Sequence, residues 1–223
     1  MTEYVQGLLQ RTQTWGFVIY RTVYTERSDE IWPAAMDRLN DLVRSGFDKH
    51  NEEADQQNRD FAWDQFQTII MEGRDVFDKA DYDELARHFD TWVAGLGSVP
   101  GQLFSGTYKA FLVIDEATLE RILDAPDDMP GYSGPPSGYT ITAVEKLPDP
   151  IDFWLDEEDE MHYYEDDEIP EPVRTWQGYF PVSLYRIFEF WVALTGENDA
   201  PEMETKWGAL QRRNLSEWTA DVW

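Results

Sequence analysis

The chain contains no cysteine, which excludes disulfides, thiolate metal sites and thiol nucleophiles. Basic residues are scarce as well, because 18 Lys and Arg stand against 45 Asp and Glu and give a formal charge of −27. Such a charge repels nucleic acid and anionic membranes, so direct nucleic-acid binding is not expected. Two explanations of the acid excess stay open: it serves solubility, or it attracts a basic partner or cations.

Long apolar runs are also missing. No segment approaches the ~20 apolar residues of a membrane span, and the opening MTEYVQGLLQRTQTW lacks the basic stretch and apolar run of a secretory signal. We therefore expect no membrane association and a cytoplasmic or nuclear location. The 223 residues suffice for one large domain or two small ones, and we expect a single domain over residues 1–223.

The common catalytic and cofactor motifs are absent too. There is no G-x-x-x-x-G-K-[ST], no G-x-G-x-x-G and no H-E-x-x-H, and the glycines around Ser133 in GYSGPPSG have the wrong spacing for a nucleophile elbow. His162 lies among acids in LDEEDEMHYYEDDE, but the segment lacks the spaced ligands and the glycine of a calcium loop. The sequence therefore predicts neither a metal site nor a cofactor.

The stretch TWGFVIYRTVY, residues 14–24, alternates large apolar and mixed side chains. Aromatic and β-branched residues in that pattern predict a strand, and their density on both faces predicts a central or near-central position in a sheet. Arg21 interrupts the pattern. We expect its stem to pack in the core while its guanidinium reaches an acidic neighbour.

The segment SDEIWPAAMDRLNDLVRSGF predicts a helix. Ser28 or Asp29 is the expected N-cap, and the helix should begin at about residues 30–32 because Pro33 is tolerated only in the first turn. Gly46 is expected to end it. The polar run DKHNEEADQQNRD that follows predicts a solvated loop or a frayed helix end. The apolar residues at helical spacing are Trp32, Met36, Leu39 and Val43.

Further elements follow along the chain. FQTIIME, YKAFLVID and YTITAVEKL predict strands. DYDELARHFDTWV predicts a helix with a capping box of Asp81 and Glu84, and Asp115 should cap another short helix. An acidic surface excursion is expected at about residues 149–172, before a C-terminal helix over residues 183–196. Together these predict an α+β fold, with one mixed four- to five-stranded sheet covered by helices, mainly on one face, and a helical C-terminal part.

The order of these segments resembles a large family of uncharacterised proteins from filamentous fungi. The resemblance covers residues 15–123 and is carried by WGFVIYRTVY, SDEIWPAAMDRL, FQTIIMEGRDVFDKADYDELARHFDTWV and YKAFLVIDEATLERIL; the later TWQGYFPVSLYRIFEFW matches more weakly. It implies an intracellular α+β protein and brings with it no activity, cofactor or catalytic residue. Residues 152–168 are more acidic than the family pattern.

Two functions are predicted as alternatives. The first is a non-catalytic interaction protein that binds a basic protein partner through the acidic excursion, where aromatic side chains give contact area and charges steer association. Its partner-binding residues would be Asp156, Glu157, Glu158, Asp159, Tyr163 and Tyr164. The second is a small-molecule-binding enzyme with an aromatic-lined pocket between sheet and helices. Its pocket residues would be Tyr20, Arg21 and His88.

Overall fold

The computed structural model describes residues 7, 9, 10, 12, 14–97, 105–127, 138–145 and 179–195. Their strands form one mixed sheet in the order β2-β1-β3-β4-β5. β1 pairs in parallel with both β2 and β3, whereas β4 is antiparallel to β3 and to β5. The strands are β1 (Val18–Arg21), β2 (Ile69–Met71), β3 (Ala110–Ile114), β4 (Thr140–Glu145) and β5 (Tyr179–Ser183). The α+β fold class and the five-stranded sheet are confirmed.

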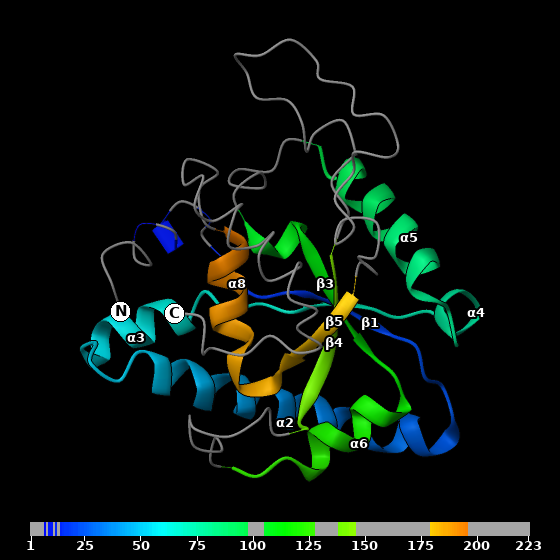
Figure 1. Cartoon of the computed structure of the whole chain (residues 1–223), viewed down its shortest axis with the longest axis horizontal. Helices are drawn as coiled ribbons and strands as arrows, with labels where there is room; N and C mark the ends of the chain where they lie inside the picture. Colours follow the sequence, from blue (N-terminus) through cyan, green and yellow to red (C-terminus); the bar gives the residue numbers. More distant parts are fainter. Residues whose placement is uncertain are drawn as a thin grey trace, which may run out of the picture.

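Helices cover both faces of this sheet (Figure 1). One face carries α2, α6 and α8, whose apolar side chains share a core with Phe17 and Ile19 of the chain around β1. The opposite face carries α4 and α5, which pack on Val18 and Tyr20. The helices are α2 (Glu26–His50), α3 (Gln56–Trp63), α4 (Arg74–Phe77), α5 (Tyr82–Gly95), α6 (Glu116–Asp124) and α8 (Ile187–Thr195), with 3-10 turns η1 (Gly106–Tyr108) and η2 (Leu184–Arg186).

β1 is the near-central strand that its composition predicts. All four of its residues are buried, because β2 and β3 flank it and helices cover both of its faces. Side chains alternate across a strand, so Ile19 enters the core under α2 while Val18 and Tyr20 enter the core under α5. The alternation also separates Arg21 from Tyr20, which matters for the site described below.

Helix α2 begins earlier than predicted. Thr25 is its N-cap, and the Thr25 hydroxyl accepts a hydrogen bond from the Ser28 amide at 3.1 Å, so the predicted caps at Ser28 or Asp29 are wrong. Pro33 lies inside the helix on its exposed side. Proline has no amide hydrogen, so the carbonyl oxygen one turn earlier in the helix loses its hydrogen bond, but on the exposed side water can bind it. Burial of the apolar face of α2 offsets the free energy lost with that bond.

Helix α2 also ends later than predicted, because Gly46 is not a stop. The helix continues to His50 and buries Phe47. Gly46 instead lies against η2, where an added Cβ would come within 1.8 Å of the Tyr185 carbonyl oxygen. The polar run after it is a loop only at residues 51–55, because residues 48–50 end α2 and α3 begins at Gln56. Asp55 caps α3 through the Asn58 amide at 2.8 Å.

The other element predictions are confirmed except at the C-terminal end of the described chain. Asp81 and Glu84 form the capping box of α5, and Asp115 caps α6. The predicted helix start at Ser183 is wrong, because this residue ends β5 and the α-helix begins at Ile187. The reason is the alternating burial of β5, whose inward side chains complete the sheet beside β4.

The acidic excursion predicted at about residues 149–172 lies outside the described residues. Among the helices that the structure does describe, none has the length and apolarity required to cross a membrane.

Candidate functional site

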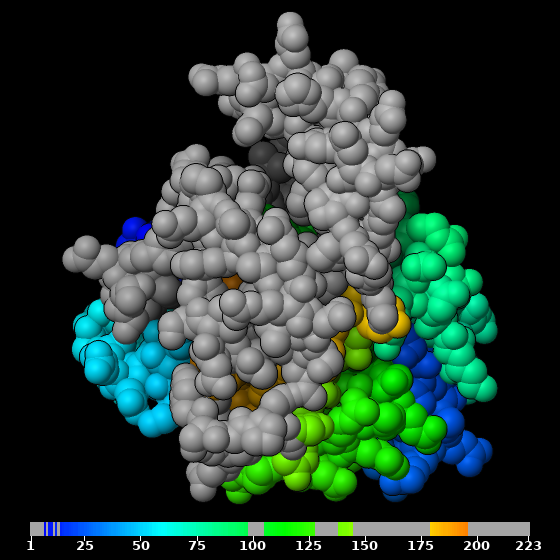
Figure 2. All heavy atoms as spheres, in the orientation of Figure 1, coloured from blue at the N-terminus to red at the C-terminus, as the bar shows by residue number. Residues whose placement is uncertain are grey.

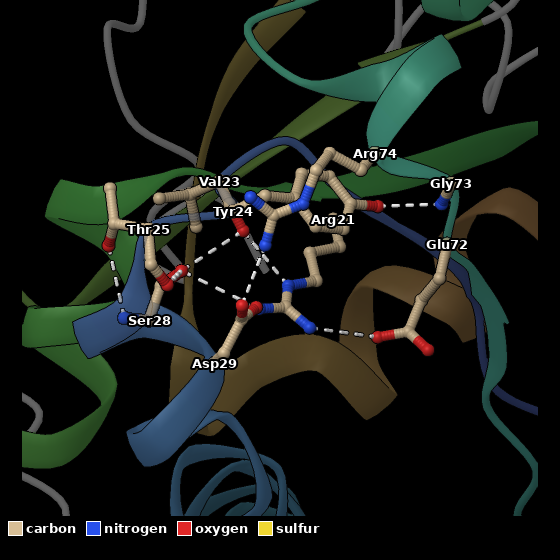
Figure 3. Close-up of polar contacts among 9 residues, drawn as sticks. All are labelled: Arg21, Val23, Tyr24, Thr25, Ser28, Asp29, Glu72, Gly73 and Arg74. Carbon is tan, nitrogen blue, oxygen red and sulfur yellow. Dashed lines mark hydrogen bonds and ion pairs between the residues drawn. The ribbon is translucent and has the colours of Figure 1, made fainter.

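The carboxyl ends of the parallel strands are where open sheets most often bind ligands, at the point where successive connections leave on opposite sides. Here the connection from β1 to β2 runs through α2 on one face, and that from β2 to β3 runs through α5 on the other. Arg21 ends β1 at this point and Glu72 follows β2 (Figure 3). This end of the sheet is therefore the first place to look for a site.

Arg21 is buried there, with 7% of its surface exposed. Its Nε donates to the carbonyl oxygen of Val23 at 2.9 Å, and one terminal nitrogen donates to a Glu72 carboxylate oxygen at 3.3 Å. The other terminal nitrogen pairs with Asp29 of α2 and lies 3.5 Å from the Ser28 hydroxyl. Each guanidinium nitrogen therefore has an acceptor within the protein.

Two aromatic rings hold the guanidinium between them. Its central carbon lies 4.6 Å from the centre of the Tyr24 ring and 4.5 Å from that of Trp32, both within cation–π range. Tyr24 is itself fixed, because its hydroxyl accepts a hydrogen bond from the Gly73 amide at 2.7 Å. Burial raises the pKa of the Tyr24 phenol.

Asp29 joins this cluster to a second arginine. One of its carboxylate oxygens binds Arg21, and the other accepts from Arg74 of α4 at 2.7 Å. The cluster thus ties the first turn of α2 to the chain after β1 and after β2. We conclude that Arg21 stabilises this end of the sheet, as expected of an arginine whose stem packs while its head meets acids, and that its nitrogens are already engaged without a ligand.

The other two predicted pocket residues meet on the opposite face. The Tyr20 hydroxyl lies 2.8 Å from Nδ1 of His88 on α5, and the Tyr20 ring packs edge-on against Phe77 and Phe111. Tyr20 is fully buried and His88 half-buried. The structure therefore brings Tyr20 and His88 together and leaves Arg21 on the far side of the sheet, because neighbouring residues of a strand point to opposite faces.

Burial raises the pKa of the Tyr20 phenol above its ordinary value, and the negative charge of Asp90 adds to the shift. In the unfolded chain this phenol ionises at about pH 10, whereas in the folded protein it keeps its proton. The resulting stability is present below about pH 10 and is lost as the pH rises toward the folded pKa, at up to about 1.4 kcal/mol per pH unit.

We therefore expect the free energy of unfolding to fall more steeply above about pH 10 in the natural protein than in the Tyr20→Phe variant. Urea unfolding curves for both proteins, taken at intervals from about pH 8 to 11, would measure the difference. Parallel dependence on pH would contradict the burial argument, whatever the absolute stability of the variant.

None of the predicted pocket residues Tyr20, Arg21 and His88 lines the hollow that lies between α2 and α6. The hollow between α2 and α6, lined by residues such as Arg27, Ile31 and Leu119, has no room for a water molecule. The described residues contain no group of three or more His, Asp or Glu side chains arranged to hold a metal ion. The predicted partner-binding residues, listed next, lie outside the described residues: Asp156, Glu157, Glu158, Asp159, Tyr163 and Tyr164.

Sequence reasoning missed the partners of Arg21. An arginine inside an apolar strand signals that an acid must be near, but 45 acids leave the choice open. Asp29 was expected to cap α2, and the segment around Glu72 was predicted only as the end of a strand. The order of the strands is the signal that could have found Asp29 and Glu72, because these residues follow the carboxyl ends of two neighbouring parallel strands, β1 and β2.

An acidic corner lies at α4 and α5, visible as blue-green atoms at the right of Figure 2. Its five exposed acids form no ion pair with a described residue. Three cations lie in the same segment: Arg74 pairs with Asp29, Arg87 donates to the backbone carbonyl of Asp83, and Lys79 is exposed. Val76 is 65% exposed among these acids. The acids of the corner are Asp75, Asp78, Asp81, Asp83 and Glu84.

Comparison of the chain with protein-family models, with curated proteins and with solved structures finds no match. The resemblance to the fungal family therefore stays a prediction from the sequence.

Proposed function

We propose that this protein is a non-catalytic interaction protein that binds a basic protein partner through its acidic surface. The observation that supports this most is the formal charge of −27, together with exposed acids at the corner of α4 and α5 that form no ion pair with a described residue. Surface carboxylates outside ion pairs attract a positively charged partner over a Debye length of about 8 Å at physiological salt.

The acidic excursion is the proposed main contact. Residues 156–159, the first four of a run of five acids, lie a few positions before Tyr163 and Tyr164. Tyrosine is enriched in the cores of interfaces because it supplies contact area together with a hydroxyl, while the acids would set the rate and specificity of association. The interior polar groups support a binding role over catalysis, since Arg21 is engaged by Asp29, Glu72 and Val23.

The alternative, a small-molecule-binding enzyme, is favoured by one observation, the hydrogen bond of 2.8 Å between Tyr20 and His88. A neutral histidine beside a phenol can accept its proton and act as a base. Two features oppose that use here. Burial disfavours the ionised phenol of Tyr20, and Arg21, the third predicted pocket residue, lies on the other face of the sheet. We therefore rank this function second.

The test begins with capture of partners on the tagged full chain from a native extract at low and high salt, with bound proteins and small molecules identified by mass spectrometry. A stoichiometric basic protein would then be purified and its Kd measured. We expect the Kd to rise at least about tenfold between about 50 and 300 mM salt. Neutralising residues 156–159, as Asp156→Asn, Glu157→Gln, Glu158→Gln and Asp159→Asn, should weaken binding by a similar factor at low salt.

A matched control removes four charges elsewhere. The exposed acids Glu30, Asp37, Asp41 and Glu53, changed to their amides, alter the net charge equally and should leave the Kd within about twofold. Equal weakening by both variants would show that only total charge matters and would reject the excursion as the contact. A retained small molecule without any protein partner would reject the interaction role and favour the enzyme.

A further inference from the structure

The two edges of the sheet differ in how they meet solvent. Edge strands carry unpaired backbone groups that can pair with another chain, and proline is one device that prevents it. The edge strand β5 contains Pro181, which has no amide hydrogen to offer. The opposite edge strand, β2, contains no proline, so its backbone lacks this protection. Its side chains are half-buried.

Hydrogen bonding shows which backbone groups of β2 point away from β1. The amides of Gln67 and Ile69 donate to the carbonyl oxygens of Trp15 and Phe17 at 2.8 and 3.1 Å. In a parallel pair, alternate residues face the neighbouring strand with both amide and carbonyl, so Thr68 and Ile70 direct theirs outward. No described residue bonds to these outward groups.

This open edge is longer than β2 itself. The parallel pairing extends back to a bridge between Trp15 and Phe66, so the chain is extended along β1 before the strand begins. Gly16 permits this approach, because its φ of +132° suits glycine and an added Cβ would lie 2.0 Å from the Gln67 carbonyl oxygen. The outward amides and carbonyls therefore recur along residues 68–72.

The charges along this edge indicate what would bind it. Asp64, Glu72 and Asp75 are exposed before and after β2. Glu72 pairs with Arg21, and the one cation in this stretch, Arg74, pairs with Asp29 of α2. A second copy of this chain would place like charges opposite one another at such an edge, which is destabilising, and would bring together two molecules of formal charge −27. An extended segment with lysine or arginine at alternate positions would instead face acids.

We infer that the β2 edge, residues 68–72, binds an extended basic segment of the partner protein as a sixth strand of the sheet. This inference rests on the proposed function and names a second contact, separate from the acidic excursion. The backbone of Thr68 and Ile70 supplies hydrogen bonds that do not depend on sequence, and the exposed acids Asp64, Glu72 and Asp75 select positively charged side chains.

The test uses an acetylated, amidated octapeptide of alternating lysine and valine as the probe. Thr68→Pro removes one outward amide without touching the bonds that Gln67 and Ile69 make to the chain around β1. We expect it to weaken peptide binding at least about fivefold. Thr68→Val keeps the amide and the branched shape and should bind as the natural protein does. The same peptide with N-methyl groups on alternate valines should not bind.

Amide exchange followed by NMR gives a second measurement that does not depend on the proline variant folding. Addition of the peptide should slow exchange at Ile70, whose amide points outward, and should change little at Ile69 and Met71, which already bond to the chain around β1. Slow exchange at Ile70 in the protein alone would mean that the edge is covered, and would overturn the inference.

The outcomes separate this inference from the proposed function. Peptide binding that Thr68→Pro does not weaken, or that leaves the Ile70 amide unprotected, would overturn the edge inference. The proposed function would still stand if the captured partner kept its salt-dependent affinity and its sensitivity to neutralisation of residues 156–159. If, in addition, the captured partner lost its dependence on salt and on residues 156–159, the proposed function would be overturned as well.

Discussion

Replacing Ile19 by aspartate is expected to leave no folded protein in solution. Ile19 has 1% of its surface exposed, in the middle of a strand with neighbours on both edges and α2 over its side chain. A carboxylate at that position would be buried without a partner, and the apolar contacts would be lost as well. The combined cost exceeds about 4 kcal/mol, a large part of the 5–15 kcal/mol that usually holds a domain together.

Soluble yield and the far-UV circular dichroism of any soluble fraction would measure this effect. Val76→Asp is the matched control, since it also replaces a β-branched residue by aspartate but at a position that is 65% exposed. It should change the free energy of unfolding by no more than about 0.5 kcal/mol. If Ile19→Asp and Val76→Asp were equally stable, β1 would not be a core strand.

Replacing Gly46 by alanine is expected to destabilise the protein by about 2 kcal/mol or more, although alanine is the better helix former by about 1 kcal/mol. Gly46 lies in the interior of α2, and the added methyl would come within 1.8 Å of the Tyr185 carbonyl oxygen in η2. That oxygen belongs to the backbone, so the clash cannot be relieved by a rotamer change. Either α2 or η2 must move.

Gly95→Ala provides the control for helix propensity. Gly95 ends α5 and has no atom within 4 Å of an added Cβ, so the substitution should be neutral or stabilising by up to about 1 kcal/mol. Urea unfolding of both variants, compared with the natural protein, would decide between propensity and packing. A stabilised Gly46→Ala variant would mean that α2 and η2 are not in contact.

Local signals in the sequence predicted the elements whose own residues suffice to define them. The caps at Asp81 and Asp115 are satisfied by amides three residues away, so a short window contains the whole interaction. The same holds for β1 and β3, where dense β-branched and aromatic residues indicate burial on both faces. The errors in element prediction lie at element ends, such as Thr25 and Ser183.

The errors arose where a distant part of the chain decides the outcome. Gly46 predicts a helix end by propensity, yet it permits α2 to approach η2, about 140 residues later in the chain. β5 contains a proline and precedes an apolar run, so its strand character depends on pairing with β4. No window of 10 to 20 residues contains that information.

At the candidate site too, local signals predicted some features, and contacts between distant segments decided others. The sequence predicted that Arg21 would meet an acid, because a buried guanidinium requires one. Under the alternative function, it predicted that Tyr20, Arg21 and His88 would share a pocket. The structure joins Tyr20 to His88 and places Arg21 with Asp29 and Glu72 on the opposite face. Which residues of one strand meet a given helix is fixed by pleat and topology together.

By itself the sequence determined the charge of this protein, its lack of thiol chemistry, the position of β1 inside a sheet and the capping of α5 and α6, because each follows from composition or from residues a few positions apart. Only the tertiary structure decided the partners of Arg21, the role of Gly46 and the open edge at β2. Those depend on which strands become neighbours, and that is settled by packing between segments far apart in the chain.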